Sequence, residues 1–136
     1  MKTLLVVAAA LVNSKNEVLL AERPSGKRLA GKWEFPGGKV EEHESPEVAL
    51  VRELHEELGI GVAPIDLEPF WFLSHDYGAE FGFHLLMPVY ICKRWHGVPH
   101  PHEHARLTWS HPRDMHALDM IEADAELVEK LQRHLV

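Results

Sequence analysis

Three glutamates in one short segment are the residues of this sequence best placed to do chemistry. Glu53, Glu56 and Glu57 lie within residues 47–58, where apolar residues recur at helical spacing. At 100° per residue, the three carboxylates fall within about 100° of one another on one face of a helix. Like charges at this spacing repel, and the negative end of the helix dipole lies close by. The cluster is therefore either a solvated acidic surface or a site with a compensating cation.

A hard divalent cation suits such a cluster, because Mg²⁺ prefers oxygen ligands and keeps positions open for water and substrate phosphates. Arg52 precedes Glu56 by four residues and is placed to orient one carboxylate through an ion pair. Just upstream, Gly37 and Gly38 provide a backbone without side chains, which can approach a ligand or a metal closely. We therefore expect Mg²⁺ here, with Mn²⁺ as the alternative metal.

The helix that must position these glutamates has clear boundaries in the sequence. Ser45 is a good N-cap, Pro46 fits the first helical position, and Gly59 is placed to end the helix. Its apolar residues fall on a separate face that should enter the core. The sequence therefore predicts a well-framed helix with an acidic face and a buried face.

The remaining elements predict a mixed α/β or α+β domain spanning residues 1–136. Residues 1–12 form an apolar run that is expected to be a strand, although they also resemble a short secretory signal. The basic segment 23–39 is expected to be a loop. Further strands and helices are expected in this order: a turn at 13–16, strands at 18–20, 65–72, 83–92 and 107–109, a short helix at 112–118 and an amphipathic helix at 123–135.

Composition limits the classes of function. The chain has 136 residues, 46% of them hydrophobic, which suits one domain with one sizeable core. Fourteen Lys and Arg against 21 Asp and Glu give a net charge of -7, which argues against stable nucleic-acid binding. No apolar run approaches the roughly 20 residues that cross a bilayer. The single cysteine, Cys92, fits a reducing compartment. We expect a cytoplasmic protein, monomeric or homodimeric, without a membrane partner.

Read from Gly38, the sequence has five residues, Glu44, seven residues and then RELHEELGI at 52–60. This pattern resembles a complete Nudix box, at 38–60, the signature of hydrolases of nucleoside diphosphates linked to another group. The preceding WEFPGG, residues 33–38, resembles the approach to the box in the MutT-like branch of that family. The resemblance extends over nearly the whole chain and implies the Nudix α/β/α sandwich.

The resemblance also implies hydrolysis of a pyrophosphate link with the help of metal ions. It assigns Glu53, Glu56, Glu57 and the carbonyl of Gly37 as metal ligands, with Glu53 also a candidate general base. Arg52 would orient the glutamates, and Arg23 would contact phosphate or sugar. The supporting residues implied by the pattern are Gly38, Glu44 and Gly59.

A later acidic residue, Glu103, stands where MutT-like enzymes often bring a second acid to the site. It is a candidate for completing the metal shell or positioning the nucleophilic water, and the alternative is an ordinary loop glutamate. His100, His102 and His104 alternate around it, a spacing that would build a separate transition-metal site in an extended segment. The neighbouring prolines favour a loop instead.

The base-binding residues are predicted less directly. By the resemblance, Asp124 at the start of the terminal helix reads the base edge, although a charge at a helix N-terminus is a competing role. An ionised Asp only accepts hydrogen bonds, which suits the N1–H and N2 donors of guanine. The apolar or aromatic candidates for the pocket walls are Leu4, Val6, Phe35 and Tyr77. His43 stands in an unconstrained position of the box where Gly is frequent, and we expect altered loop geometry there.

These observations predict a Mg²⁺-dependent nucleoside triphosphate pyrophosphohydrolase of the MutT type. It would hydrolyse 8-oxo-dGTP or a related nucleotide to the monophosphate and pyrophosphate, which would cleanse the nucleotide pool and support DNA repair. One alternative is a CTP-type or broad-specificity pyrophosphatase. Another is a non-catalytic Nudix module that binds a nucleotide and regulates a partner, although all three box glutamates are present.

Overall fold

The apolar run at the start of the chain is the strand β1 (Lys2–Leu11), which lies inside a four-stranded mixed sheet. A computed structural model describes residues 1–135, and Val136, the last residue of the predicted domain, lies outside the described residues. In this sheet β1 pairs in parallel with β6 (Phe83–Cys92) and antiparallel with β4 (Gly37–Lys39). The fourth strand, β5 (Leu67–Asp76), pairs antiparallel with β6 and gives the order β4-β1-β6-β5.

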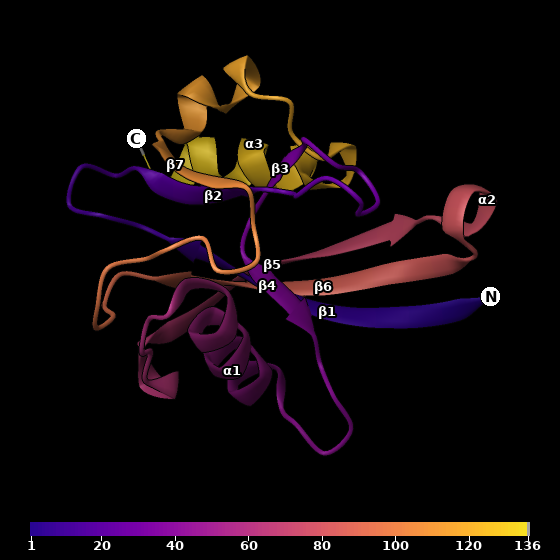
Figure 1. Ribbon diagram of the computed structural model, residues 1–136, viewed down its shortest axis with the longest axis horizontal. Coiled ribbons are helices and arrows are strands. Elements are labelled where there is room, and N and C mark those ends of the chain that lie inside the picture. Colours follow the sequence, from indigo (N-terminus) through magenta and orange to yellow (C-terminus); the bar gives the residue numbers. More distant parts are fainter. Residues whose placement is uncertain (136) are drawn as a thin grey trace.

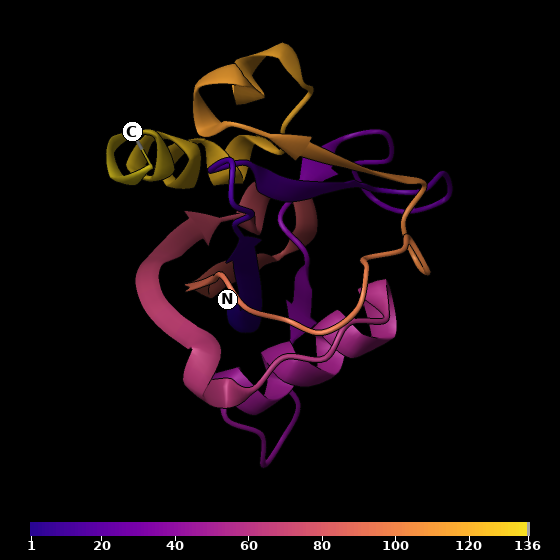
Figure 2. The same cartoon turned by 90° about the vertical axis from the view of Figure 1, so that its left-hand side faces the viewer.

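Both faces of this sheet are covered, which explains why β1 reads as a continuous apolar run. Val7, Ala9 and Leu11 belong to the core cluster that includes the helix α1 (Pro46–Leu58). The alternate residues Ala8 and Ala10 face the second cluster, which includes the helix α3 (Ala125–His134). Figures 1 and 2 show α1 and α3 on opposite sides of the sheet, as expected for an α/β/α sandwich.

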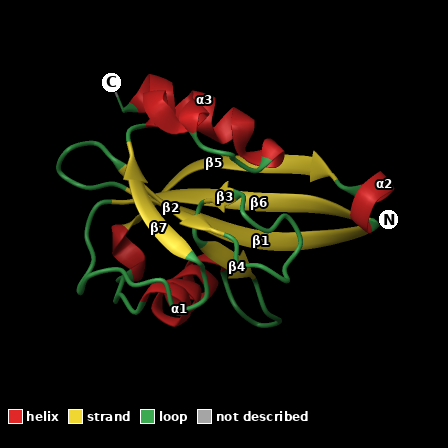
Figure 3. Cartoon of the chain, turned by 45° about the horizontal axis from the view of Figure 1, so that its top comes forward, coloured by secondary structure: helices red, strands yellow, loops and turns green. Residues whose placement is uncertain are grey.

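A second, three-stranded antiparallel sheet lies on the α3 side. Its order is β3-β2-β7, with β2 at Val18–Glu22, β3 at Trp33–Glu34 and β7 at Arg106–Ser110. Figure 3 shows β7 crossing the direction of the long strands, with α3 beside β5. This sheet brings Glu34 of β3 to the cavity described below.

The helix α1 begins and ends where the sequence predicts. The Ser45 side chain accepts a hydrogen bond from the Val48 N–H, and Pro46 occupies the first turn. Gly59 adopts φ 71°, and its N–H bonds to the carbonyl of His55, which closes the last turn. A left-handed residue at this position favours glycine because a Cβ is strained there. The buried face of α1 includes Leu50, Leu54 and Leu58.

Several predicted boundaries were wrong. The basic segment 23–39 is not wholly a loop, because it contains β3, which pairs with the preceding strand β2, and β4, which pairs with β1 near the start of the chain. The strand expected at 65–72 begins later, since Pro64–Asp66 forms a 3₁₀ turn, and it runs on to Asp76. The helix expected at 112–118 is a 3₁₀ helix at Pro112–Ala117. The terminal helix starts at Ala125, after the 3₁₀ turn Glu122–Asp124.

A short helix, α2 (Gly78–Phe81), connects β5 to β6 and has no counterpart among the predicted elements. Cys92 is buried in β6 as a free thiol. Among residues 1–135, no helix is long and apolar enough to cross a membrane.

Candidate active site

The carboxylate cluster of α1 packs directly against the backbone of β4. A Cβ built on Gly38 would lie 2.4 Å from Cδ of Glu53 and 2.5 and 2.6 Å from its two carboxylate oxygens. Any larger residue would displace this carboxylate, because real Cβ atoms do not approach other atoms so closely. Gly38 therefore lets the β4 backbone and Glu53 share one small space.

Arg52 ties the loop before α1 to the acidic face of the helix. Its Nε and Nη2 donate to the Glu44 carboxylate at 2.7 and 2.9 Å, a bidentate pair. Its Nη1 donates to Glu53 at 3.0 Å and to Glu56 at 3.4 Å, and Nη2 also donates to the Lys39 carbonyl at 3.1 Å. Arg52 thus contacts both of the glutamates that it is predicted to orient. The guanidinium lowers the pKa of Glu44 to about 2.

Glu57 is the most buried member of the acidic cluster, with a side chain only 7% exposed. Its Oε2 has no hydrogen-bond partner among the described residues. Burial raises the pKa of Glu57 well above its ordinary value, and the nearby carboxyls of Glu53, Glu34 and Glu103 raise it further. A buried carboxyl in this setting binds either a proton or a cation.

The residues around Glu57 fit a divalent cation by their chemistry. They offer carboxylate oxygens on α1, an unpartnered Oε2 and the close backbone of β4, all of them hard oxygen donors. Within residues 1–135, no three His, Cys, Asp or Glu side chains already converge as a finished ligand set. Ligation would therefore require Glu53 and Glu56 to turn from Arg52 toward the cation.

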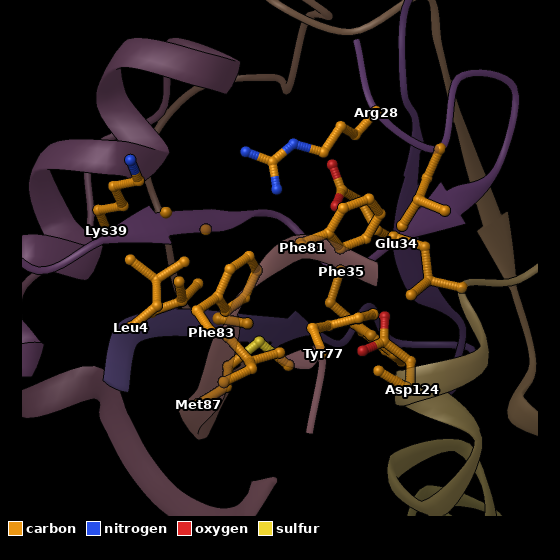
Figure 4. Close-up of a pocket in the computed structure, with 18 of the residues that line it drawn as sticks. Leu4, Arg28, Glu34, Phe35, Lys39, Tyr77, Phe81, Phe83, Met87 and Asp124 are labelled. Atoms are coloured by element: carbon orange, nitrogen blue, oxygen red, sulfur yellow. The ribbon is translucent and has the colours of Figure 1, made fainter. Parts of the chain in front are cut away.

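A cavity of about 670 Å³ opens beside β4 and lies within the size range of small-molecule sites. All the predicted substrate-binding residues line it, as do Gly37 and Gly38. Figure 4 shows Leu4 and Lys39 on one side of this cavity and Asp124 on the other. The predicted lining residues are Leu4, Val6, Arg23, Phe35, Tyr77 and Asp124.

Asp124 is buried at the cavity although it directly precedes α3. Asp124 occupies the N-cap position of α3, but its side chain makes no capping hydrogen bond to the helix. Burial raises the pKa of Asp124 to about 7, with a further contribution from Glu34, while the backbone N–H of Phe35 acts in the opposite direction. The cavity thus contains one carboxyl that titrates near neutral pH.

Sequence reasoning missed several residues of the cavity. Arg28 places its guanidinium over the rings of Phe81 and Phe83, 4.8 and 5.8 Å from their centroids. Glu34 accepts from Nη1 of Arg23 at 3.1 Å, so the predicted phosphate or sugar contact is engaged within the protein. The motif WEFPGGK contains Glu34 and Lys39 and was a usable signal for both. Arg28 belongs to the basic segment 23–39, but nothing local indicated that it lies over the rings of Phe81 and Phe83.

The loop that follows β6 reaches the same site. Glu103 is exposed and does not line the cavity, but its charge contributes to the raised pKa of Glu57. His104 turns inward, with Nε2 3.1 Å from Glu34 and 3.6 Å from Glu57. His100 and His102 instead stack with each other, their ring centroids 6.5 Å apart. The three histidines therefore do not form a separate metal site within the described part of the chain.

A helix-borne acidic cluster beside a large cavity edged by Arg23, Arg28 and Lys39 defines a site for a phosphorylated ligand and a divalent ion. Comparison with known proteins agrees with this class. The NUDIX domain matches residues 2–131 of the chain. The chain therefore belongs to the NUDIX family, as the resemblance of residues 38–60 predicted.

Three relatives illustrate the match. The chain is 37% identical over 123 residues to the CTP pyrophosphohydrolase of Escherichia coli, covering 90% of this chain and 87% of that one. It is 32% identical over 133 residues to the 8-oxo-dGTP diphosphatase of Escherichia coli, covering 98% and 99%. The crystal structure of the MutT NUDIX hydrolase from Burkholderia pseudomallei has a TM-score of 0.84 at 30% identity, covering 96% and 98%. The predicted fold and the predicted class, a Nudix hydrolase, are confirmed.

Proposed function

We propose that this protein is a Mg²⁺-dependent nucleoside triphosphate pyrophosphohydrolase that acts on 8-oxo-dGTP or a related purine nucleotide. The products would be the nucleoside monophosphate and pyrophosphate. The observation that carries this proposal is that one cavity is lined both by Asp124 and by Gly38, whose backbone lies against the Glu53 carboxylate. A nucleotide with its base at Asp124 would present its phosphates to the acidic face of α1.

The proposed metal ligands are Glu53, Glu56, Glu57 and the Gly37 carbonyl, with Glu103 as a further candidate. A bound divalent ion would neutralise phosphate charge and lower the pKa of a bound water. Arg52 would hold Glu53 and Glu56 in place before the ion binds, through its contacts at 3.0 and 3.4 Å, and would release them as they turn toward the ion. Glu53 stays the candidate general base, since it lies against the β4 backbone where phosphates would enter.

The base would bind among Phe35, Tyr77, Leu4 and Val6, with Asp124 at its polar edge. An ionised carboxylate only accepts, so it complements the N1–H and N2 donors of a guanine edge. A protonated carboxyl both donates and accepts, which complements the N3 acceptor and N4 donor of cytosine. Because the pKa of Asp124 is about 7, both states are accessible near neutral pH.

A CTP-type activity is therefore the second candidate, and the similarity to the CTP pyrophosphohydrolase of Escherichia coli supports it. The base chemistry separates the two candidates. If Asp124 reads the base, the ratio of kcat/KM for 8-oxo-dGTP to that for CTP should rise as the pH increases through about 7. A ratio independent of pH would contradict this reading of the base.

The test of the proposed activity is pyrophosphate release from 8-oxo-dGTP, dGTP, CTP and ATP, with Mg²⁺ and then with EDTA. Glu53→Gln serves as the variant of the carboxylate cluster, and Arg113→Gln, an exposed arginine far from the cavity lining, as the matched control. Metal-dependent release that Glu53→Gln abolishes and Arg113→Gln retains would support the proposal. Mg²⁺-dependent nucleotide binding without release would instead indicate a non-catalytic binding module.

The proposed setting of this activity is the cytoplasm, where it would remove oxidised nucleotides before they enter DNA. The partner is a small nucleotide rather than a nucleic acid or a membrane, in keeping with the net charge of -7. Monomer and homodimer both remain compatible with this proposal.

A further inference from the structure

His104 and Glu34 have no role in the proposed reaction, yet they connect its two halves. Nε2 of His104 lies 3.1 Å from Oε2 of Glu34 and 3.6 Å from Oε1 of Glu57. Glu34 in turn accepts from Nη1 of Arg23 at 3.1 Å. Glu34 and Arg23 line the cavity, while Glu57 belongs to the acidic cluster of α1. A continuous series of polar contacts therefore runs from the cavity wall to the proposed metal ligands.

The burial of His104 indicates that these contacts determine its position. Its side chain is only 6% exposed, and its Nδ1 has no hydrogen-bond partner among the described residues. Carboxylate oxygens only accept, so Nε2 carries the hydrogen that is donated to Glu34. A buried polar atom without a partner is unfavourable. The imidazole keeps this position although its Nδ1 stays unpaired. This indicates that the contacts of Nε2 with the two carboxylates hold the ring in place.

The backbone around His104 is anchored to the end of α1. The N–H groups of His100 and His102 donate to the carbonyls of Leu58 and Glu57, each at 3.0 Å. The ring of His102 covers Gly59, where an added Cβ would lie 2.8 Å from the imidazole Cε1. The loop therefore satisfies carbonyls that the last turn of a helix leaves without partners. This docking holds His104 against Glu57.

We propose that His104 is a positioning residue that couples the nucleotide cavity to the metal ligands. By holding Glu34 through Nε2 while lying beside Glu57, it fixes the separation of the two carboxylates on β3 and α1. A nucleotide that contacts Glu34 or Arg23 then favours the Glu57 position that binds metal, and metal binding favours the nucleotide by the same factor. This inference rests on the proposed function, since it takes Glu57 as a metal ligand.

Three variants test the role of His104. His104→Gln keeps an N–H donor close to the place of Nε2, whereas His104→Met has a similar length and no donor. His100→Met changes an exposed histidine of the same loop and is the matched control. Thermal unfolding of each variant establishes that it folds. If His104→Met does not fold, His104→Gln still provides the test.

The affinity of each protein for Mn²⁺ is measured from the electron paramagnetic resonance signal of the free ion. The measurement is made with and without a non-hydrolysable α,β-imido analogue of dGTP, and kcat and KM are measured beside it. In the wild type and His100→Met, the analogue should tighten Mn²⁺ binding by about tenfold or more, a usual size for coupling between sites. His104→Met should lose most of this factor and also lose kcat by about tenfold, and His104→Gln should retain both within about threefold.

Two results would overturn the inference while leaving the proposed function intact. One is that His104→Met keeps the coupling factor and the kcat of the wild type. The other is equal losses in His104→Gln and His104→Met in parallel with reduced thermal stability, which would show that His104 acts through packing alone. Absence of both Mn²⁺ binding and hydrolysis in the wild type would overturn the proposed function, and the role of His104 with it.

Discussion

Replacing Glu57 with glutamine should change how the stability of the metal-free protein depends on pH. Burial, followed by the carboxyls of Glu53, Glu34 and Glu103, raises the pKa of Glu57 in the folded protein. In the unfolded chain a glutamate titrates near about 4.3. The folded protein therefore keeps a proton that the unfolded chain releases. The resulting stabilisation is complete below about pH 4.3 and is lost progressively as the pH rises toward the raised pKa.

The magnitude follows from one proton. A difference of one bound proton changes the free energy of unfolding by about 1.4 kcal/mol per pH unit. Between pH 5.5 and 7.5 the wild type should lose up to about 2.7 kcal/mol through Glu57 alone, and Glu57→Gln should not. Other titrating groups, including Asp124, are present in both proteins and cancel in the difference. Urea unfolding in EDTA at pH 5.5, 6.5 and 7.5 measures this difference.

Glu56→Gln is the matched control, because Glu56 lies one residue earlier on the same helix and is 50% exposed. Its stability curve should run parallel to that of the wild type. Mg²⁺ in place of EDTA should stabilise the wild type at pH 7.5 by mass action and should have little effect on Glu57→Gln. If the free energies of unfolding of Glu57→Gln and the wild type changed with pH in parallel, the reasoning that Glu57 binds a proton in the absence of a cation would be refuted.

Three further changes have expected outcomes. Asp124→Asn should raise the free energy of unfolding at pH 8 by up to about 4 kcal/mol and have little effect near pH 4. The reason is that burial raises the pKa of Asp124 to about 7, so the stability that its bound proton provides is lost as the pH rises through that value. Urea unfolding at both pH values checks this, and equal effects would contradict it. Arg52→Gln should move acid unfolding to higher pH, since the ion pair with Arg52 lowers the pKa of Glu44 to about 2 and stabilises the fold above about pH 4.3. An unchanged midpoint of acid unfolding, measured by circular dichroism, would argue against that ion pair. His43 adopts φ 67°, a left-handed conformation that costs a non-glycine residue about 1 kcal/mol, so His43→Gly should raise Tm by about 2–4 °C while His43→Ala should give no gain.

The acidic helix was predictable from the sequence because its signals are local. Ser45, Pro46 and Gly59 define its ends within one segment, and the caps form as those residue types predict. The glutamates of the box are spaced by the helix itself, so their common face needs no tertiary information. Gly38 was also predictable in kind, although only the structure reveals that its missing side chain makes room for Glu53.

The short strands β3 and β4 escaped prediction for the opposite reason. Each is only two or three residues long and forms by pairing with another strand: β3 with the preceding strand β2, and β4 with β1 near the start of the chain. The segment that contains them is rich in Gly, Pro and cations, which locally favours a loop. Pairing with β1 and β2 overrides that preference. The same strands bring Glu34, Gly37 and Gly38 to the site, so a boundary error in this segment also concealed a residue of the cavity.

His104 shows most clearly where sequence reasoning stops. Its spacing with His100 and His102 is typical of a shared metal site, but the loop turns so that His104 points inward while His100 and His102 stack with each other. Its partner Glu34 is 70 residues away in the sequence, and neither residue carries a local mark of the other. The glutamates proposed to bind the metal can be read from a helix because a helix fixes their spacing. The contacts that join this chemistry to nucleotide binding arise only when separate elements meet, so in this protein they require the folded structure.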